Sequence, residues 1–309
     1  MIIDFHCHFF RKNHFPDYFW NGQAEFFHGY FQGQGKTKDI DQINREFIPV
    51  FWEAHDRNAI HQMDEAGIDK AVILHVDFTY GREDDLQPVE VQHRQIHDLI
   101  SQYPDRYIYF MGIDPRWPSA WKPLVDKKEE YNIRGVKLNP VAGFYPDNKE
   151  FFGFYERIAE LSLPVMMHQG PLFEPFESES SHPYRLEAVL KAFPQISFIA
   201  AHMAFAWWRE LLEVAGKYEN IMCDISGWQL VVASNPAKFV HILRKVIDGF
   251  GKHRVLFGTD SATFDRFISK KEWVDFIKGL SDESFGQDRI TQEEIQALLG
   301  DNAARLFGF

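Results

Sequence analysis

Short apolar runs alternate with amphipathic stretches along most of the chain. Eight of the runs have the length and the β-branched or aromatic content of strands, and runs such as 71–74 and 198–201 are apolar at every position. Continuous apolar runs of this length are typical of parallel strands that are buried on both faces. The pattern predicts strands at residues 2–6, 70–76, 107–113, 134–138, 164–168, 196–202, 221–225 and 254–259.

The stretches between these runs have the periodicity of helices. They predict helices at residues 57–66, 89–102, 118–131, 149–161, 183–193, 207–217 and 236–250. Strands that alternate with helices in this way predict a single α/β domain over residues 1–309, a (β/α)8 TIM barrel. An open doubly wound sheet is the alternative, but the Gly-x-Gly-x-x-Gly turn of its dinucleotide-binding form does not follow the first strand.

Two segments fall outside this alternation. Residues 9–51 follow the first strand and are dense in phenylalanine, tyrosine and tryptophan. An insertion of this length predicts a lid-like segment over a substrate pocket, and a packing flap or an oligomer contact is the alternative. Residues 291–309 predict a C-terminal helical tail that Thr291 caps together with Glu294.

Composition excludes several classes of partner. The net charge of −12 and the lack of a long Lys/Arg cluster argue against nucleic acid. No apolar stretch approaches the ~20 residues that a membrane-spanning helix needs. With two cysteines and no leader pattern, we expect a cytoplasmic protein that binds a small molecule, and the aromatic excess makes a homodimer plausible.

The first strand ends in two histidines two positions apart, His6 and His8. Residues with this spacing point to the same side of a strand, so their imidazoles converge as metal ligands must. Cys7 between them is expected on the opposite face, in the core. The pair alone is a weak sign of metal, because a hydrogen-bonded polar edge has the same pattern.

Other strands end in polar residues as well. The fourth, fifth, sixth and eighth predicted strands end at or next to Lys137, His168, His202 and Asp260. Each has an ordinary explanation alone: a helix cap for the aspartate, for example, or a lysine that reaches solvent. Together they would ring one barrel mouth, where active sites of such barrels lie. Buried there, they need either a cation or an extensive hydrogen-bond network.

These motifs, taken in order, resemble the amidohydrolase superfamily, in particular the amidohydrolase-related branch that includes aminocarboxymuconate-semialdehyde decarboxylase. The resemblance runs from residue 6 to the end of the chain. It rests on Asp4-Phe5-His6-Cys7-His8, Ala66-Gly67-Ile68-Asp69-Lys70-Ala71-Val72, Gly135-Val136-Lys137-Leu138-Asn139-Pro140, Val165-Met166-Met167-His168, Ala201-His202, Leu256-Phe257-Gly258-Thr259-Asp260 and Asn302-Ala303-Ala304-Arg305-Leu306-Phe307.

The resemblance implies a metal site. It implies one divalent metal, zinc or alternatively manganese, bound by His6, His8, His168 and Asp260. It implies that His202 lies beside the metal as a catalytic or substrate-binding group. Lys137 is expected to bind the substrate's carboxylate; carboxylated, it would instead bridge two metals, as in other superfamily members.

The function that we expect is a metal-dependent hydrolase, in which a metal-activated water attacks an amide, ester or lactone of a small carboxylate substrate. Asp260 would move the water's proton, and His202 would polarise the scissile carbonyl. Non-oxidative decarboxylation of an aromatic or unsaturated acid is the alternative, together with hydration of a double bond. Residues 203–208 lack the glycine-rich stretch frequent in the decarboxylases, which favours hydrolysis. A non-enzymatic binding protein is the remaining hypothesis.

Overall fold

Eight parallel strands form one sheet in the order of the sequence, each hydrogen-bonded to the next. The computed structural model describes all residues except 37, 53–56 and 83–84. The last strand returns to the first, because the Phe5 amide donates to the Phe257 carbonyl at 2.8 Å and a parallel bridge joins Cys7 to Ser261. The predicted TIM barrel is confirmed. Its strands are β1 (Ile3–Cys7), β2 (Lys70–Leu74), β3 (Tyr107–Gly112), β4 (Ile133–Leu138), β5 (Val165–Met167), β6 (Phe198–Ala200), β7 (Ile221–Asp224) and β8 (Val255–Leu256).

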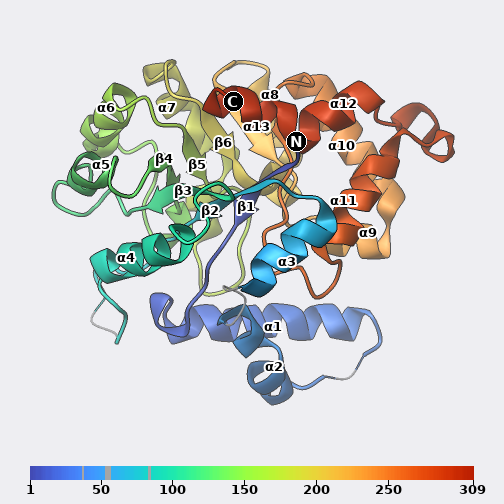
Figure 1. Cartoon of the computed structure of the whole chain (residues 1–309), viewed down its shortest axis with the longest axis horizontal. Helices are drawn as coiled ribbons and strands as arrows, with labels where there is room; N and C mark the ends of the chain where they lie inside the picture. The colour runs from blue at the N-terminus through green and yellow to red at the C-terminus, as the bar shows by residue number, and fades with distance from the viewer. Residues whose placement is uncertain (37, 53–56, 83–84) are drawn as a thin grey trace.

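Helices surround the barrel (Figure 1). Most lie where the periodicity predicts them but are shorter, as where residues 118–131 give only α5. Four were not predicted: two in the insertion after β1, one after β7 and one after β8. One of these, α11, begins at a capping box formed by Ser269 and Glu272. The helices are α1 (Asp17–Gly33), α2 (Ile40–Glu46), α3 (Arg57–Ala66), α4 (Val89–Ile100), α5 (Lys122–Lys127), α6 (Phe152–Glu160), α7 (Glu187–Ala192), α8 (Trp208–Ala215), α9 (Gln229–Ser234), α10 (Pro236–Phe250), α11 (Lys270–Lys278), α12 (Gln292–Gln296) and α13 (Asn302–Phe307). None of these helices is both long enough and apolar enough to cross a membrane.

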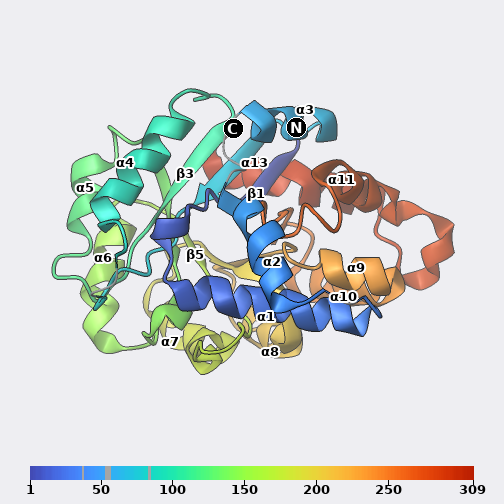
Figure 2. The same cartoon turned by 90° about the horizontal axis from the view of Figure 1, so that it is seen from below.

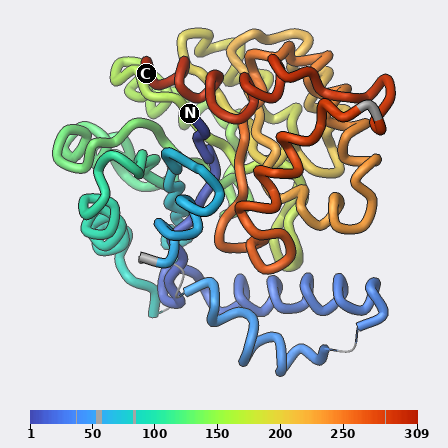
Figure 3. Tube along the Cα trace, turned by 45° about the vertical axis from the view of Figure 1, so that its right-hand side comes forward, coloured from blue at the N-terminus to red at the C-terminus, as the bar shows by residue number. Residues whose placement is uncertain are grey.

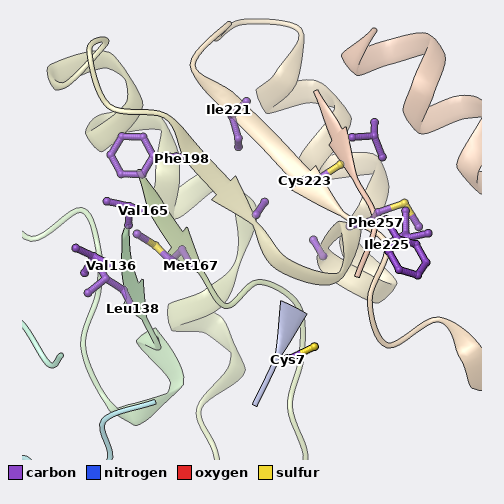
Figure 4. Packing of buried hydrophobic residues seen from close by; sticks show 14 of the residues in the cluster. Cys7, Val136, Leu138, Val165, Met167, Phe198, Ile221, Cys223, Ile225 and Phe257 are labelled. Atoms are coloured by element: carbon purple, nitrogen blue, oxygen red, sulfur yellow. The ribbon is translucent and has the colours of Figure 1, made fainter. Parts of the chain in front are cut away.

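The hydrophobic core has one layer between the strands and the surrounding helices and a second layer inside the barrel. Outward-facing residues of the strands pack against the helices, and Figure 4 shows part of this layer with Cys7, Val136 and Phe198. Cys7 therefore lies in the core, as predicted. A second cluster fills the barrel and includes Phe5 and Phe307, whose rings stack at 5.5 Å. Phe307 belongs to the C-terminal tail, where Thr291 and Glu294 form the predicted capping box.

A bulge in β1 turns the two histidines toward the barrel interior. The register of β1 against β2 shifts between Asp4 and Cys7. Phe5 packs among the inner residues of the barrel, and His6 directly after it also contacts inner groups. An extra residue in one strand re-aims the side chains that follow it. The bulge therefore places His6 and His8 inside and keeps Cys7 outside.

The insertion after β1 is helical rather than an irregular loop. Helices α1 and α2 lie below the barrel in Figure 1, at the end opposite to the N-terminus and α13, and α1 crosses the face seen in Figure 2. The tube in Figure 3 shows the same segment set apart from the barrel wall. Its aromatic residues form a cluster of their own together with loop residues such as Phe78, Phe176 and Phe264.

Candidate metal centre and active site

A cavity of about 350 Å³ lies between the barrel mouth and α1. Its floor is built from strand ends, and its walls are mostly phenylalanine rings. All six of the predicted site residues line it, so the fold brings together groups from five strands. The lining includes His6, His8, Lys137, His168, His202, Asp260, Phe10, Phe15, Phe19, Gln23, Phe26, Phe78, Phe173, Phe205 and Phe264.

The hydrogen bonds of His6 and His8 fix the state of both rings. Nδ1 of His8 donates to the carbonyl of Leu74 at 2.8 Å, and Nδ1 of His6 donates to Oδ2 of Asp224 at 2.9 Å. In a neutral imidazole the other nitrogen then carries the lone pair. The two Nε2 atoms face each other at 3.1 Å, so two lone pairs meet in a buried site. Only a cation or an extra proton between them removes this repulsion.

Asp260 joins His6 and His8 in one group of ligand atoms, whereas His168 lines the same cavity outside that group. Oδ1 of Asp260 lies 3.3 Å from Nε2 of His8 and 3.8 Å from Nε2 of His6. Burial raises the pKa of Asp260, but contacts with the His8 and His6 imidazoles outweigh it and hold the pKa well below its usual range. Nε2 of His168 is buried and has no hydrogen-bond partner among the residues that the structure describes.

This donor set fits a divalent metal. Two nitrogen atoms 3.1 Å apart can share one ion at the ~2.1 Å typical of zinc–imidazole bonds. The Nδ1 atom of His6 is bonded to the Asp224 carboxylate, and that of His8 to the Leu74 carbonyl. Metal-binding histidines are usually held by such a bond at their second ring nitrogen. Nε2 of His168 has no partner among the described residues, but it is not part of the group that His6, His8 and Asp260 form, so its role as a ligand stays a prediction.

His202 is held by a residue pair that the sequence analysis did not single out. Oγ of Ser226 donates to Asp224 and lies 2.8 Å from Nδ1 of His202. The hydroxyl oxygen therefore accepts a hydrogen bond from Nδ1–H, and the lone pair of His202 sits on Nε2. Burial and the charge of His6 lower the pKa of His202 to about 4, so the ring is neutral at pH 7.

Asp224 was missed, although it ends β7 as the other site residues end their strands. It is fully buried, and its carboxylate also accepts from the backbone amides of His202 and Ser226. Although burial raises its pKa, the contacts with His6 and His202 hold the pKa well below the usual range. Asp224 with His6 and His202 could also hold a metal by distance, but here Nδ1 of His6 is already bonded to Asp224 and Nδ1 of His202 to Ser226.

Lys137 supplies a buried positive charge on the floor. Lys137 is the penultimate residue of β4 and is 2% exposed. Burial lowers its pKa to about 8, although the carboxylates of Asp224 and Asp260 raise it. At neutral pH the lysine is thus largely a cation, and an anion in the cavity could pair with it without competition from bulk water.

The chain turns left-handed directly after β6. Residues His202 to Phe205 have φ between 46° and 61°, a region that costs non-glycine residues about 1–2 kcal/mol each. The turn stacks the Phe205 ring on the His202 ring at 4.6 Å. Gly227 makes room for it, because a Cβ there would lie 2.7 Å from the Phe205 ring. This turn includes residues of the 203–208 stretch, which lacks the glycines frequent in the decarboxylases. Its positive φ angles explain why glycine is favoured there.

The fold is shared with decarboxylases, one of which was solved with manganese. 2,6-Dihydroxybenzoate decarboxylase from Rhizobium is 16% identical, with a TM-score of 0.67 over 99% of this chain and 98% of that one. 5-Carboxyvanillate decarboxylase from Novosphingobium aromaticivorans, solved with manganese and 4-hydroxy-3-methoxy-5-nitrobenzoic acid, is also 16% identical, with a TM-score of 0.67 over 100% and 96% of the two chains.

A curated relative and a family model match the sequence itself. Protein fluG of Emericella nidulans is 22% identical over 274 residues, which are 86% of this chain. The match spans only 29% of that longer protein. The sequence model of the amidohydrolase family, by contrast, matches residues 3–309. With that match over nearly its whole length, the chain belongs to the amidohydrolase family.

Proposed function

We propose that the protein is a metal-dependent decarboxylase of a planar aromatic or unsaturated carboxylic acid. The observation that carries the proposal is the division of the cavity: a floor of metal-type ligands and one lysine, and walls of phenylalanine. Such a cavity takes up a flat apolar ring with a charged group at one end. Two structures of the same fold that bear the names of aromatic acid decarboxylases support this choice over hydrolysis.

The metal would be held by His6, His8, His168 and Asp260, and would supply positive charge to fix and polarise the acid or a neighbouring hydroxyl. Lys137 would bind the carboxylate, since it is the buried cation of the lining. The aromatic walls would fix the plane of the ring and exclude water. Exclusion of water favours loss of the carboxylate, because the product, carbon dioxide, is uncharged.

In this proposal Asp260 would deliver the proton. It is the one carboxylate among the described residues of the lining, and its low pKa means that it gives up a proton readily once it has received one. His202, neutral and with its lone pair on Nε2, would accept a hydrogen bond from a substrate hydroxyl or water. The ring carbon takes the proton, its bond to the carboxylate breaks, carbon dioxide leaves, and one proton is taken from solvent overall.

Hydrolysis, the first expectation from the sequence, is the second candidate. The ionised state of Asp260 favours it, because a carboxylate next to the metal would act as a general base toward an attacking water. The same residues would then keep their places, with Lys137 on the substrate's carboxylate and His202 on the scissile carbonyl. Zinc or manganese suits either reaction, so the metal does not separate them.

Elemental analysis and a product assay test the proposal. The purified protein is expected to hold about one equivalent of zinc or manganese, whereas two equivalents would indicate a carboxylated Lys137 between two ions. The protein is expected to release carbon dioxide from aromatic acids in a substrate panel and to hydrolyse none of the esters and lactones in it. Asp260→Asn should lower turnover at least 10³-fold while most metal stays bound. The exposed Asp301→Asn serves as the matched control. Turnover of esters alone would establish hydrolysis instead.

A further inference from the structure

A fully buried carboxylate lies beside the metal ligands but outside the cavity. Asp4 has no exposed surface, and it is not one of the residues that line the cavity. Its Oδ2 accepts hydrogen bonds from the hydroxyl of Thr259 at 2.6 Å and from the thiol of Cys7 at 3.0 Å. A buried carboxylate is costly unless donors compensate it. The fold therefore keeps a costly group at a point that the proposed chemistry does not reach.

The other oxygen of Asp4 pairs with a backbone amide of the β1 bulge. A bulge leaves a residue unpaired in the strand ladder, and a buried amide needs a partner. The amide of His6, within the register shift between Asp4 and Cys7, donates to Oδ1 of Asp4 at 3.2 Å. The carboxylate thus stabilises the bulge that turns His6 and His8 toward the cavity.

The same oxygen also holds the chain next to Asp260. Strand β8 ends at Leu256, and beyond it the amide of Thr259 donates to Oδ1 of Asp4 at 2.9 Å. Asp260 comes directly after Thr259 and has a φ of 53°, in the left-handed region. A non-glycine residue keeps such a backbone only where its surroundings fix it. The amide of Asp260 donates to the His6 carbonyl at 2.8 Å, so this ligand is tied to β1 by two backbone bonds in succession.

We propose that Asp4 is a positioning residue, which sets the distance between the metal ligands of β1 and the ligand after β8. Its Oδ1 joins the amide of His6, itself a ligand, to the amide of Thr259 directly before Asp260. Movement of one strand end relative to the other therefore breaks a bond to Asp4. The inference rests on the metal site of the proposed function, and it holds for decarboxylation and hydrolysis alike.

The metal affinity of two Asp4 variants tests this inference, measured for zinc in competition with a chelator. Asp4→Ala leaves both amides without their acceptor and should weaken zinc binding about 10–100-fold, the loss typical of groups that orient metal ligands. Asp4→Asn keeps one oxygen for the two amides and should restore most of the affinity. The visible absorption spectrum of the cobalt-loaded protein reports the arrangement of the ligands. It should change in Asp4→Ala and match the parent in Asp4→Asn.

Asp69→Ala is the matched control at the other end of the same strand. Oδ2 of Asp69 accepts from the amide of Ile2 at 2.6 Å, just before β1 begins. Zinc affinity and the cobalt spectrum should stay those of the parent in this variant. An equal loss of affinity in both alanine variants would mean that any loosening of β1 weakens the site, and the inference would be wrong.

The remaining outcomes separate positioning from stability and from the proposed function. If Asp4→Ala melts at a lower temperature but binds zinc and cobalt as the parent does, Asp4 serves stability alone and the inference is wrong. If Asp4→Ala does not fold, Thr259→Val carries the test, because it removes the hydroxyl that holds Oδ2. It should weaken zinc binding several-fold, whereas Thr259→Ser should not, and equal affinities would overturn the inference. If the parent binds no metal, the proposed function falls and the inference with it.

Discussion

The floor and the roof of the cavity are built in opposite ways. The floor draws on residues from separate strands, and hydrogen bonds fix its key rings, as with Asp224 on His6 and Ser226 on His202. The roof comes mainly from one segment, residues 9–51, and is held by ring packing, such as Phe15 on Phe19 at 4.5 Å. Directional bonds preserve catalytic geometry, whereas ring packing tolerates changes of shape. We infer that the floor determines the reaction and the roof determines which molecule undergoes it.

The largest expected effect that separates the two regions is on the floor. Asp224→Asn removes the charge that orients His6 while leaving every cavity-lining residue in place. Loss of such an outer partner typically lowers metal affinity 10–100-fold, and we expect a drop in that range. Competition with a chelator, read out by elemental analysis, measures it.

Asp64→Asn is the control for this variant, because it removes a carboxylate from an ion pair with Arg106 outside the cavity. Metal affinity should be unchanged there. Equal metal affinity in Asp224→Asn and the parent would show that His6 holds its position without the carboxylate, and the contrast between floor and roof would lose its basis.

A smaller effect, about tenfold in KM, is expected at Lys137. Its pKa is lowered to about 8 by burial, so the ammonium that binds a carboxylate is present below that pH and is lost above it. KM for the acid should therefore rise with pH through this region. Lys137→Met should raise KM at pH 7 and remove the dependence. A bound cation would move the loss of the Lys137 proton to lower pH. The test is therefore whether KM rises with pH, and not the pH at which it rises.

The exposed Lys122→Met controls for loss of a lysine as such. A KM that falls with rising pH, or a pH dependence that persists in Lys137→Met, would mean that the carboxylate is bound elsewhere on the floor.

The floor could largely be predicted from the sequence. Parallel strands in a barrel end at one mouth, so polar residues at strand ends meet whatever their separation in the chain. His6, His8, His168, His202, Lys137 and Asp260 all line one cavity for this reason. The bulge in β1 could not be predicted, because it arises from pairing with β2 and leaves no pattern in the strand itself.

Asp224 was missed for a related reason. It ends its strand in an apolar run, Ile221-Met222-Cys223, and a single aspartate at such a point is common at the start of a turn. Its role depends on contacts with His6 and His202, which lie far away in sequence. The roof was foreseen only as an aromatic insertion, since the helical face of α1 and the place of Gln23 on it depend on how α1 packs over the mouth.

The smallest effect is expected on the roof, from Gly22→Ala. The new methyl group would lie 2.5 Å from the Glu174 carbonyl and from the Phe173 ring, so α1 must shift. Phe173 and Gln23 both line the cavity, and KM should rise a few-fold while metal content stays constant. Overpacking of this kind costs about 1–3 kcal/mol, which lowers the melting temperature by several degrees. Gly29→Ala, where an added Cβ meets nothing within 4 Å, should leave KM unchanged and improve the helix slightly. A change in metal content in Gly22→Ala would mean that floor and roof form one unit.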